Sequence, residues 1–241
     1  MTAALLFLAA IVAGAIASLA GFGIGSILTP LLALSTGTKQ AVVAVSIPHL
    51  IATAIRFWSM RRSIDLHVLK NFGIASAAGG LAGALLGARF SSPVLAYILG
   101  ALLVFAGVTG LTGLAQKMRF GTAVAWLGGA ASGLLGGLVG NQGGIRSAAL
   151  QGFNLEAKAF VATATAIALV VDGARMPVYF FTSPDIVEQF ALWIAAMVVG
   201  VTIGTLAGAR VLRRIPEMYF RRLVALLILA LGVVMLIGVG K

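Results

Sequence analysis

The feature that most limits how this chain can fold is an apolar run at residues 3–34 that carries a break near its middle. As one helix the run would be roughly 48 Å long, whereas the hydrocarbon core of a bilayer is about 30 Å thick. Its middle reads Gly21-Phe-Gly-Ile-Gly-Ser-Ile-Leu-Thr-Pro30, with three glycines at alternate positions and a proline, all of which disfavour helix. We predict two helical pieces joined by unwound backbone at Gly21–Gly25. Unwound backbone at membrane depth is tolerated where it lines a cavity, which indicates a binding site; a glycine-rich packing face or a plain kink is the alternative.

The same feature occurs a second time. The stretch Gly140-Asn-Gln-Gly-Gly-Ile-Arg-Ser147 interrupts an apolar run at residues 124–153, and Gly140 follows Gly21 by 119 positions, close to half the chain. Glycine-interrupted apolar segments at matching positions of two halves are the best sequence indication of a transporter's binding site.

Composition places the whole chain in the membrane. Hydrophobic residues make up 61% of it and charged residues only 10%, which is typical of a polytopic α-helical membrane protein. There are 17 Lys and Arg against 6 Asp and Glu, a net charge of +11 that in a soluble protein would suggest nucleic-acid binding. Here the basic residues fall mostly in short loops between apolar runs, so we interpret them as positive-inside topology signals.

Further landmarks indicate that the two halves are a duplication. Lys39 and Lys158 are 119 positions apart, as are Arg56 and Arg175. Glycines recur at offsets of 121 and 125: Gly79, Gly83 and Gly87 with Gly200, Gly204 and Gly208, and Gly107 with Gly232. Because glycines four apart let helices approach closely, we expect central packing helices there. The prediction is one membrane domain built from a first transmembrane repeat at 1–118 and a second at 119–241.

The loop charges favour an inverted repeat over a parallel one. If each broken run crossed the membrane once, the repeats would be parallel and the basic residues would divide six against eight. If each broken run enters and returns, both termini are extracytoplasmic and the basic residues divide eleven against three, the cytoplasmic excess that the positive-inside rule requires. We therefore predict an all-α polytopic membrane protein of two inverted repeats, each with one Gly-broken or re-entrant helix pair plus three full transmembrane helices.

Three arginines lie outside the loops, and ionisable groups at membrane depth usually face a cavity or a partner. Arg56 and Arg175 lie late in apolar segments, and Arg146 follows the second break. For Arg56 the alternative is snorkelling to the membrane interface, and for Arg146 it is a position at the membrane edge. For Arg175 it is an ion pair with Asp172, three residues earlier on the same helix face.

Together these features favour an anion as the ligand. A half-helix N-terminus presents unpaired N–H groups and a positive dipole end. In an inverted repeat two such ends, from Ser26 and from Ile145 onward, would approach the midplane from opposite sides. Arginine adds a charged fork that matches oxyanion geometry. The predicted substrate-binding residues are Gly21, Gly23, Gly25, Ser26, Thr29, Gly140, Asn141, Gln142, Gly143, Gly144, Arg146 and Arg175.

Candidates for coupling and gating are fewer. Asp172 is the only carboxylate within an apolar segment and His49 the only histidine in one, and either residue could carry a proton. We group Arg56 with them. The alternative for His49 is a satisfied core histidine, and the alternative for Asp172 is an ion pair with Arg175. The sequence has no cysteine, no carboxylate pair and no histidine pair at metal spacing, so we expect no enzyme activity, no cofactor and no metal site.

On these motifs the chain resembles the sulfite exporter TauE/SafE family, also called the four-toluene sulfonate uptake permease group. The likeness rests on residues 21–30, 39–46, 140–144 and 172–175, and through the duplicated layout it extends over essentially the whole chain. Where the family's second glycine motif commonly ends in proline, this chain has Ala149. The resemblance implies a carrier of sulfite or organosulfur anions in a bacterial inner membrane.

The expected function is therefore a secondary carrier or permease for a small sulfur-containing anion, such as sulfite or an organosulfonate, with alternating access around the two broken helices. An uncoupled small-anion channel or facilitator is the first alternative, and a non-transporting membrane scaffold is the second. Proton coupling and a homodimer are left open, and no nucleic-acid partner is expected.

Overall fold

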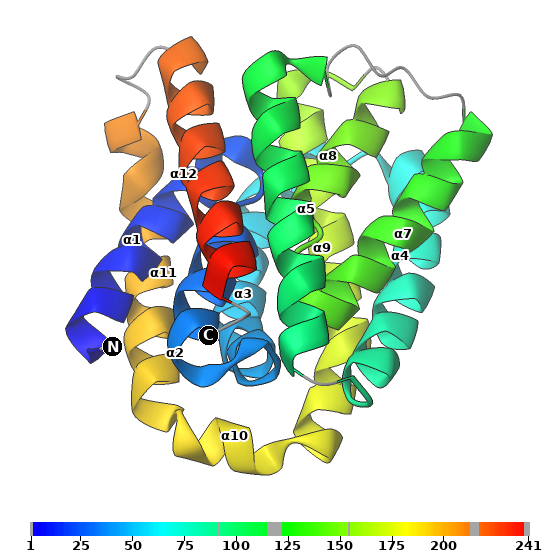
Figure 1. Ribbon diagram of the computed structural model, residues 1–241. Coiled ribbons are helices and arrows are strands. Elements are labelled where there is room, and N and C mark those ends of the chain that lie inside the picture. Colours follow the sequence, from blue (N-terminus) through cyan, green and yellow to red (C-terminus); the bar gives the residue numbers. More distant parts are fainter. Residues whose placement is uncertain (1, 91, 115–121, 154, 213–216, 239–241) are drawn as a thin grey trace.

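A computed structural model describes residues 2–90, 92–114, 122–153, 155–212 and 217–238 as a bundle of helices, with no β-strand in these ranges (Figure 1). The first half contains α1 (Ala3–Ala20), α2 (Ile24–Thr36), α3 (Thr38–Met60), the 3-10 turn η1 (Arg61–Ser63), α4 (Leu66–Gly87) and α5 (Ser92–Thr112). The second half contains α7 (Thr122–Val139), α8 (Gly143–Leu150), the 3-10 turn η2 (Gln151–Phe153), α9 (Ala157–Thr182), α10 (Pro184–Gln189), α11 (Ala191–Leu212) and α12 (Glu217–Gly238).

The helices have the length and surface of membrane spans. Six helices in the described ranges are long and apolar enough to cross a membrane, namely α1, α3, α4, α5, α9 and α11. Large apolar side chains such as Leu81, Leu127 and Leu192 are exposed on the bundle, where a membrane protein meets lipid. The prediction of an all-α polytopic membrane protein is confirmed.

The first apolar run is broken at its glycines. Helix α1 ends at Gly21, which adopts the left-handed φ of 75° that suits glycine, and the Gly21 N–H donates to the Ala17 carbonyl oxygen at 3.0 Å. Gly23 has a φ of 135°, and helix α2 begins at the next residue. Pro30 lies inside α2 and does not end it.

The second run is broken in the same way, and both breaks are shorter than predicted. Gly140 follows the end of α7 with a φ of 72°, and α8 begins at Gly143. The prediction of unwound backbone through Gly25 and Gly144 is wrong, because both residues are helical and each half-helix begins two residues earlier than expected. Gly25 and Gly143 allow close contact between helices, as described below, and this role gives the same sequence pattern as unwinding.

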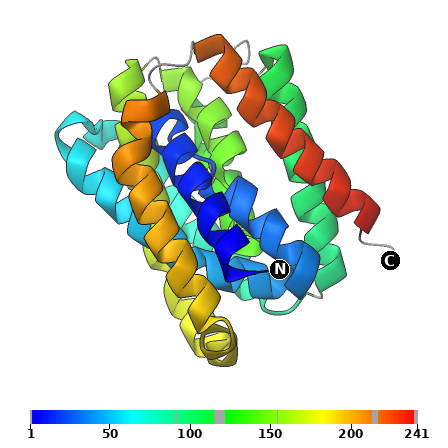
Figure 2. The same ribbon diagram turned by 90° about the vertical axis from the view of Figure 1, so that its left-hand side faces the viewer.

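The helices of the two halves run in opposite senses (Figures 1 and 2). From the N-terminus at the lower end of Figure 1, α1 runs upward, α2 returns downward, and α3, α4 and α5 run up, down and up. In the second half α7 runs downward, α8 returns upward, and α9, α11 and α12 run down, up and down. Each broken run therefore enters and returns, which is the arrangement that an inverted repeat requires.

The repeated glycines bring helices of the two halves into close contact. A Cβ at Gly79 or Gly83 of α4 would overlap backbone carbonyl oxygens of α7, and one at Gly200 or Gly204 of α11 would overlap those of α1. The glycine pair at an offset of 125 lies in the contact between α5 and α12. The close packing expected at these glycines is confirmed, and the pairing is reciprocal, since α1 packs on α11 while α7 packs on α4. The expectation that these helices are central is wrong, because α4 and α11 lie at the sides of the bundle (Figure 1).

Candidate functional site

The two breaks lie directly against each other in the interior. A Cβ on Gly25 would overlap the Gly140 carbonyl oxygen, and one on Gly143 would lie 2.5 Å from the Cβ of Phe22. Any side chain at these glycines would push the breaks apart. From this contact α2 runs downward and α8 runs upward, so two helix N-termini with their positive dipole ends converge (Figure 1).

Polar side chains of both breaks are buried with them. Ser26 Oγ donates to Asn141 Oδ1 at 3.1 Å, and Ser132 Oγ of α7 donates to the Gln142 carbonyl oxygen at 2.9 Å. Gln142 is buried, yet neither atom of its side-chain amide has a partner within the described ranges, and the same holds for the Thr29 hydroxyl. Because buried polar groups are normally hydrogen-bonded, these groups are available to a ligand.

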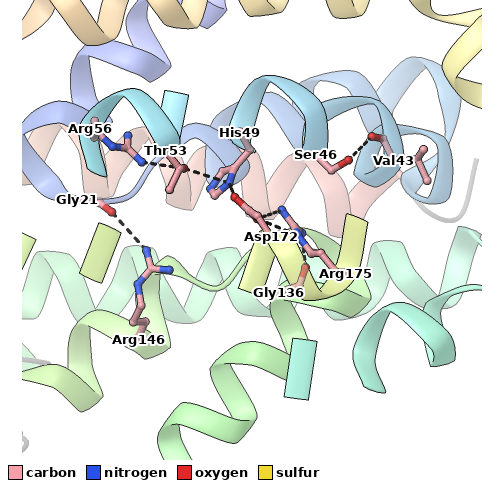
Figure 3. Close-up of polar contacts among 10 residues, drawn as sticks. All are labelled: Gly21, Val43, Ser46, His49, Thr53, Arg56, Gly136, Arg146, Asp172 and Arg175. Atoms are coloured by element: carbon pink, nitrogen blue, oxygen red, sulfur yellow. Dashed lines mark hydrogen bonds and ion pairs between the residues drawn. The ribbon is translucent and has the colours of Figure 1, made fainter. Parts of the chain in front are cut away.

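Arg146 extends from α8 to the first break. Its side chain is 1% exposed, and Nη2 donates to the Gly21 carbonyl oxygen at 3.3 Å (Figure 3). Its Nε and Nη1 atoms have no partner among the residues that the structure describes. The alternative of a position at the membrane edge is therefore wrong, because the guanidinium is buried where the two halves meet.

An ionic network joins α3, α9 and α7 beside the breaks. Asp172 Oδ2 lies 2.6 Å from His49 Nδ1, and its Oδ1 accepts from Arg175 Nε at 3.0 Å and lies 2.8 Å from Arg175 Nη2 (Figure 3). Arg175 Nη1 also donates to the Gly136 carbonyl oxygen at 2.6 Å. The alternative of an Asp172–Arg175 ion pair is confirmed. His49 is buried and bonded to Asp172, which agrees with the alternative of a satisfied core histidine.

Arg56 is buried on α3 and is less completely bonded than Arg175. It is 4% exposed, which contradicts the snorkelling alternative. Arg61, five residues further along, is exposed and donates to the Trp58 carbonyl oxygen. Arg56 Nη2 donates to Thr53 Oγ1 at 3.2 Å. No partner for its Nε or Nη1 occurs in the part of the chain that the structure describes. Thr53 Oγ1 in turn lies 3.5 Å from His49 Nδ1.

The buried charges do not balance. We call the following residues the polar centre: His49, Thr53, Arg56, Arg146, Asp172 and Arg175. It holds three guanidiniums, while Asp172 is the only buried carboxylate in the described ranges, so that with a neutral imidazole the net charge is +2. Removing unpaired charge from water is strongly unfavourable, so this arrangement suits a negatively charged ligand.

Sequence reasoning missed three residues around this site: Thr53, Ser132 and Tyr179. The Tyr179 hydroxyl donates to the Gly137 carbonyl oxygen of α7, and its ring centroid lies 5.8 Å from the Arg175 guanidinium carbon. Its place four residues after Arg175, on the same helix face, was the available signal. Tyr179 also lines a small hollow near the lower end of the bundle, which is bordered by Gly137 and Lys39.

The structure divides the predicted site into one group at the two breaks and a second group in the ionic network beside them. The glycines of the breaks, with Ser26, Thr29, Asn141, Gln142 and Arg146, meet at the contact between the halves. Arg175, predicted as a substrate ligand, is bonded to Asp172 and Gly136, whereas Arg56, predicted as a gating residue, keeps two unpartnered nitrogens in the described chain.

Comparison with known proteins gives one family. The chain matches the family model described as Sulfite exporter TauE/SafE over residues 6–235. No curated protein and no solved structure matches the chain. The matched range includes both breaks and every residue of the polar centre.

Proposed function

This chain belongs to the sulfite exporter TauE/SafE family, and from that premise we propose that it is a secondary transporter of a small sulfur-containing anion, sulfite or an organosulfonate. The proposed binding site is the contact between the two breaks. Membership of a transporter family and the six apolar helices of spanning length within the described ranges agree in making it a multi-pass membrane transporter.

One observation carries the proposed site. The guanidinium of Arg146 is buried beside two converging helix N-termini and is bonded only to a neutral carbonyl oxygen in the described chain. Helix N-termini and guanidinium groups both bind oxyanions, the first through backbone N–H groups and the second through a planar fork of donors. The buried amide of Gln142 adds uncharged donors on a further side.

We propose that the chain consists of two inverted repeats, 1–118 and 119–241, and that the site between them opens alternately to the two sides of the membrane. The opposite helix directions of the halves support this mechanism. On the lower side the hollow beside Tyr179 extends toward the second break. Toward the upper end, Phe72, Leu150 and Ile167 belong to one buried apolar cluster, which would have to separate for the site to open there.

The proposed orientation places the upper end in the cytoplasm of a bacterium and both termini outside its inner membrane. Arg61, Arg62 and Lys158 are exposed at the upper end, while the exposed residues of α10 at the lower end include Asp185 and Glu188. This distribution follows the positive-inside rule. A reporter fused to the C-terminus that is active only outside the cytoplasm is expected to give signal.

Proton coupling is proposed to reside in the contact between His49 and Asp172. The pair connects α3 of one half to α9 of the other, so a proton taken up by the neutral imidazole would convert this hydrogen bond into an ion pair and change the strength of a contact between the halves. An uncoupled facilitator would use the same anion site without this step.

The test is flux of labelled sulfite into proteoliposomes, with and without a pH gradient. We expect saturable flux that the gradient changes, and we expect Arg146→Ala to abolish it while Arg62→Ala, at an exposed position, retains it. Saturable flux that ignores the gradient would support the facilitator. No flux of any small anion through folded protein would support a scaffold and reject transport.

A further inference from the structure

Arg56 and Arg175 make the same local contact in the two halves, but with different partners. They are 119 positions apart, and each donates to the residue three positions earlier on its own helix. In the second half that residue is Asp172, and in the first half it is Thr53. The contact is therefore duplicated in geometry and differs in charge.

The difference decides which arginine is free to bind an anion. The charge of Arg175 is balanced by the Asp172 carboxylate, which accepts a hydrogen bond from Nε and lies 2.8 Å from Nη2. A threonine hydroxyl cannot balance the charge of Arg56. Arg146 likewise has only the neutral carbonyl oxygen of Gly21 among the described residues.

Arg56 and Arg146 act within one region. Figure 3 shows the two guanidiniums toward the same side of the His49–Asp172 pair, with Gly21 between them. Each has its Nε and one Nη without a partner in the described ranges, so that four buried donor nitrogens remain for a ligand.

We propose that Arg56 and Arg146 form the anion clamp, and that its two unbalanced charges select a divalent oxyanion over a monovalent one. The clamp rests on the proposed transport function. It makes Arg56 a substrate ligand, where the sequence predicts a gating residue, and it removes Arg175 from the predicted substrate ligands. A sulfite dianion, or a sulfonate that carries a second acidic group, would neutralise the polar centre. A monovalent alkanesulfonate would leave one buried charge unpaired, which is unfavourable.

Thr53→Asp is the sharpest test, because it gives the first half the contact that the second half already has. The new carboxylate would pair with Arg56 and lower the net charge of the centre from +2 to +1. We expect the ratio of sulfite flux at alkaline pH to methanesulfonate flux to fall at least about tenfold, since charges a few ångströms apart interact strongly at a buried site. Thr53→Asn, of the same size but neutral, should keep the wild-type ratio.

The flux ratio is measured within one preparation, so a loss of folded protein lowers both fluxes and leaves the ratio intact. A wild-type protein that carries methanesulfonate as well as sulfite, or a Thr53→Asp variant with an unchanged ratio, would overturn the clamp while transport stands. A wild-type protein that carries neither anion would overturn the transport function. The clamp is then judged by thermal stabilisation of the purified protein, where sulfite must stabilise more than methanesulfonate and Thr53→Asp must remove that difference.

Discussion

The helical frames of the two halves match, whereas their buried polar residues do not. In both halves a helix is broken at glycines, a half-helix returns, and glycines spaced by four pack one long helix against the broken helix of the other half. The charged residues of the centre follow no such rule. Positions 119 apart hold His49 and Ala168, Ile27 and Arg146, and Thr53 and Asp172.

This contrast separates what the matching frames provide from what function requires. The matching frames provide two helix N-termini at one place and one buried arginine from each half, Arg56 and Arg175. The three unmatched residues add one cation, one anion and one titratable imidazole at a single location. We infer that the frame allows alternating access, while the unmatched residues determine the ligand and its coupling.

The largest effect is expected when the unmatched carboxylate is removed. Asp172→Asn would leave Arg175 and His49 without their shared charged partner, and breaking a buried ion pair in this way destabilises by about 3–5 kcal/mol. Thr53→Ala, at the corresponding position of the first half, should cost less, about 1.5–3 kcal/mol, because one hydrogen bond from a charged donor to a neutral acceptor is lost. Thermal unfolding in detergent measures both, and equal losses would contradict the contrast between the halves.

The next effect separates function from stability. Arg146→Ile copies the residue at the corresponding position of the first half, Ile27. We expect sulfite affinity to fall about 100-fold, since hydrogen bonds to charged groups are each worth about 1.5–3 kcal/mol. Stability should stay the same or rise, because an unpaired buried charge is removed. Arg146→Lys keeps the charge and loses the planar pair of donors, so its sulfite affinity should lie between those of the wild type and of Arg146→Ile. Full transport by Arg146→Ile would show that Arg146 is not part of the site.

A third pair of substitutions tests the matching frame. Gly83→Ala on α4 and Gly204→Ala on α11 each place a Cβ against the backbone of the neighbouring broken helix. We expect each to destabilise by about 1–3 kcal/mol and by similar amounts, as overpacking does. Gly173→Ala is the control, since nothing lies within 4 Å of the added Cβ. A large effect at only one of the two sites would show that the frames differ more than their packing indicates.

The sequence predicted the frame well because glycine and apolar patterns are local signals. The runs, the breaks and the close-packed helices follow from residue spacing alone, and so does the Asp172–Arg175 pair, which lies within one helix turn. Glycine is ambiguous in one respect. It serves both unwinding and close approach, so the pattern predicts unwound backbone at Gly25 and Gly144, which are helical.

Contacts across the chain were beyond sequence reasoning. His49 and Asp172 are 123 positions apart, and only the packing of α3 on α9 brings them together. The burial of Arg56 was equally hidden, because the exposed Arg61 and Arg62 one turn further along suggested a common surface position. Depth in the membrane depends on how helices pack, and spacing along one helix does not determine it.

The smallest effect concerns Tyr179, which has no counterpart in the first half, where the corresponding residue is Met60. Tyr179→Phe removes the hydroxyl that donates to the Gly137 carbonyl oxygen and keeps the ring beside Arg175. The expected loss of stability is about 1 kcal/mol, the net value of one neutral hydrogen bond, with transport retained. Tyr97→Phe, at an exposed position on α5, is the matched control and should change neither property. Loss of transport at unchanged stability would instead mean that the Tyr179 hydroxyl takes part in anion passage through the hollow that it lines, and the contrast between the halves would then extend from the polar centre to the pathway itself.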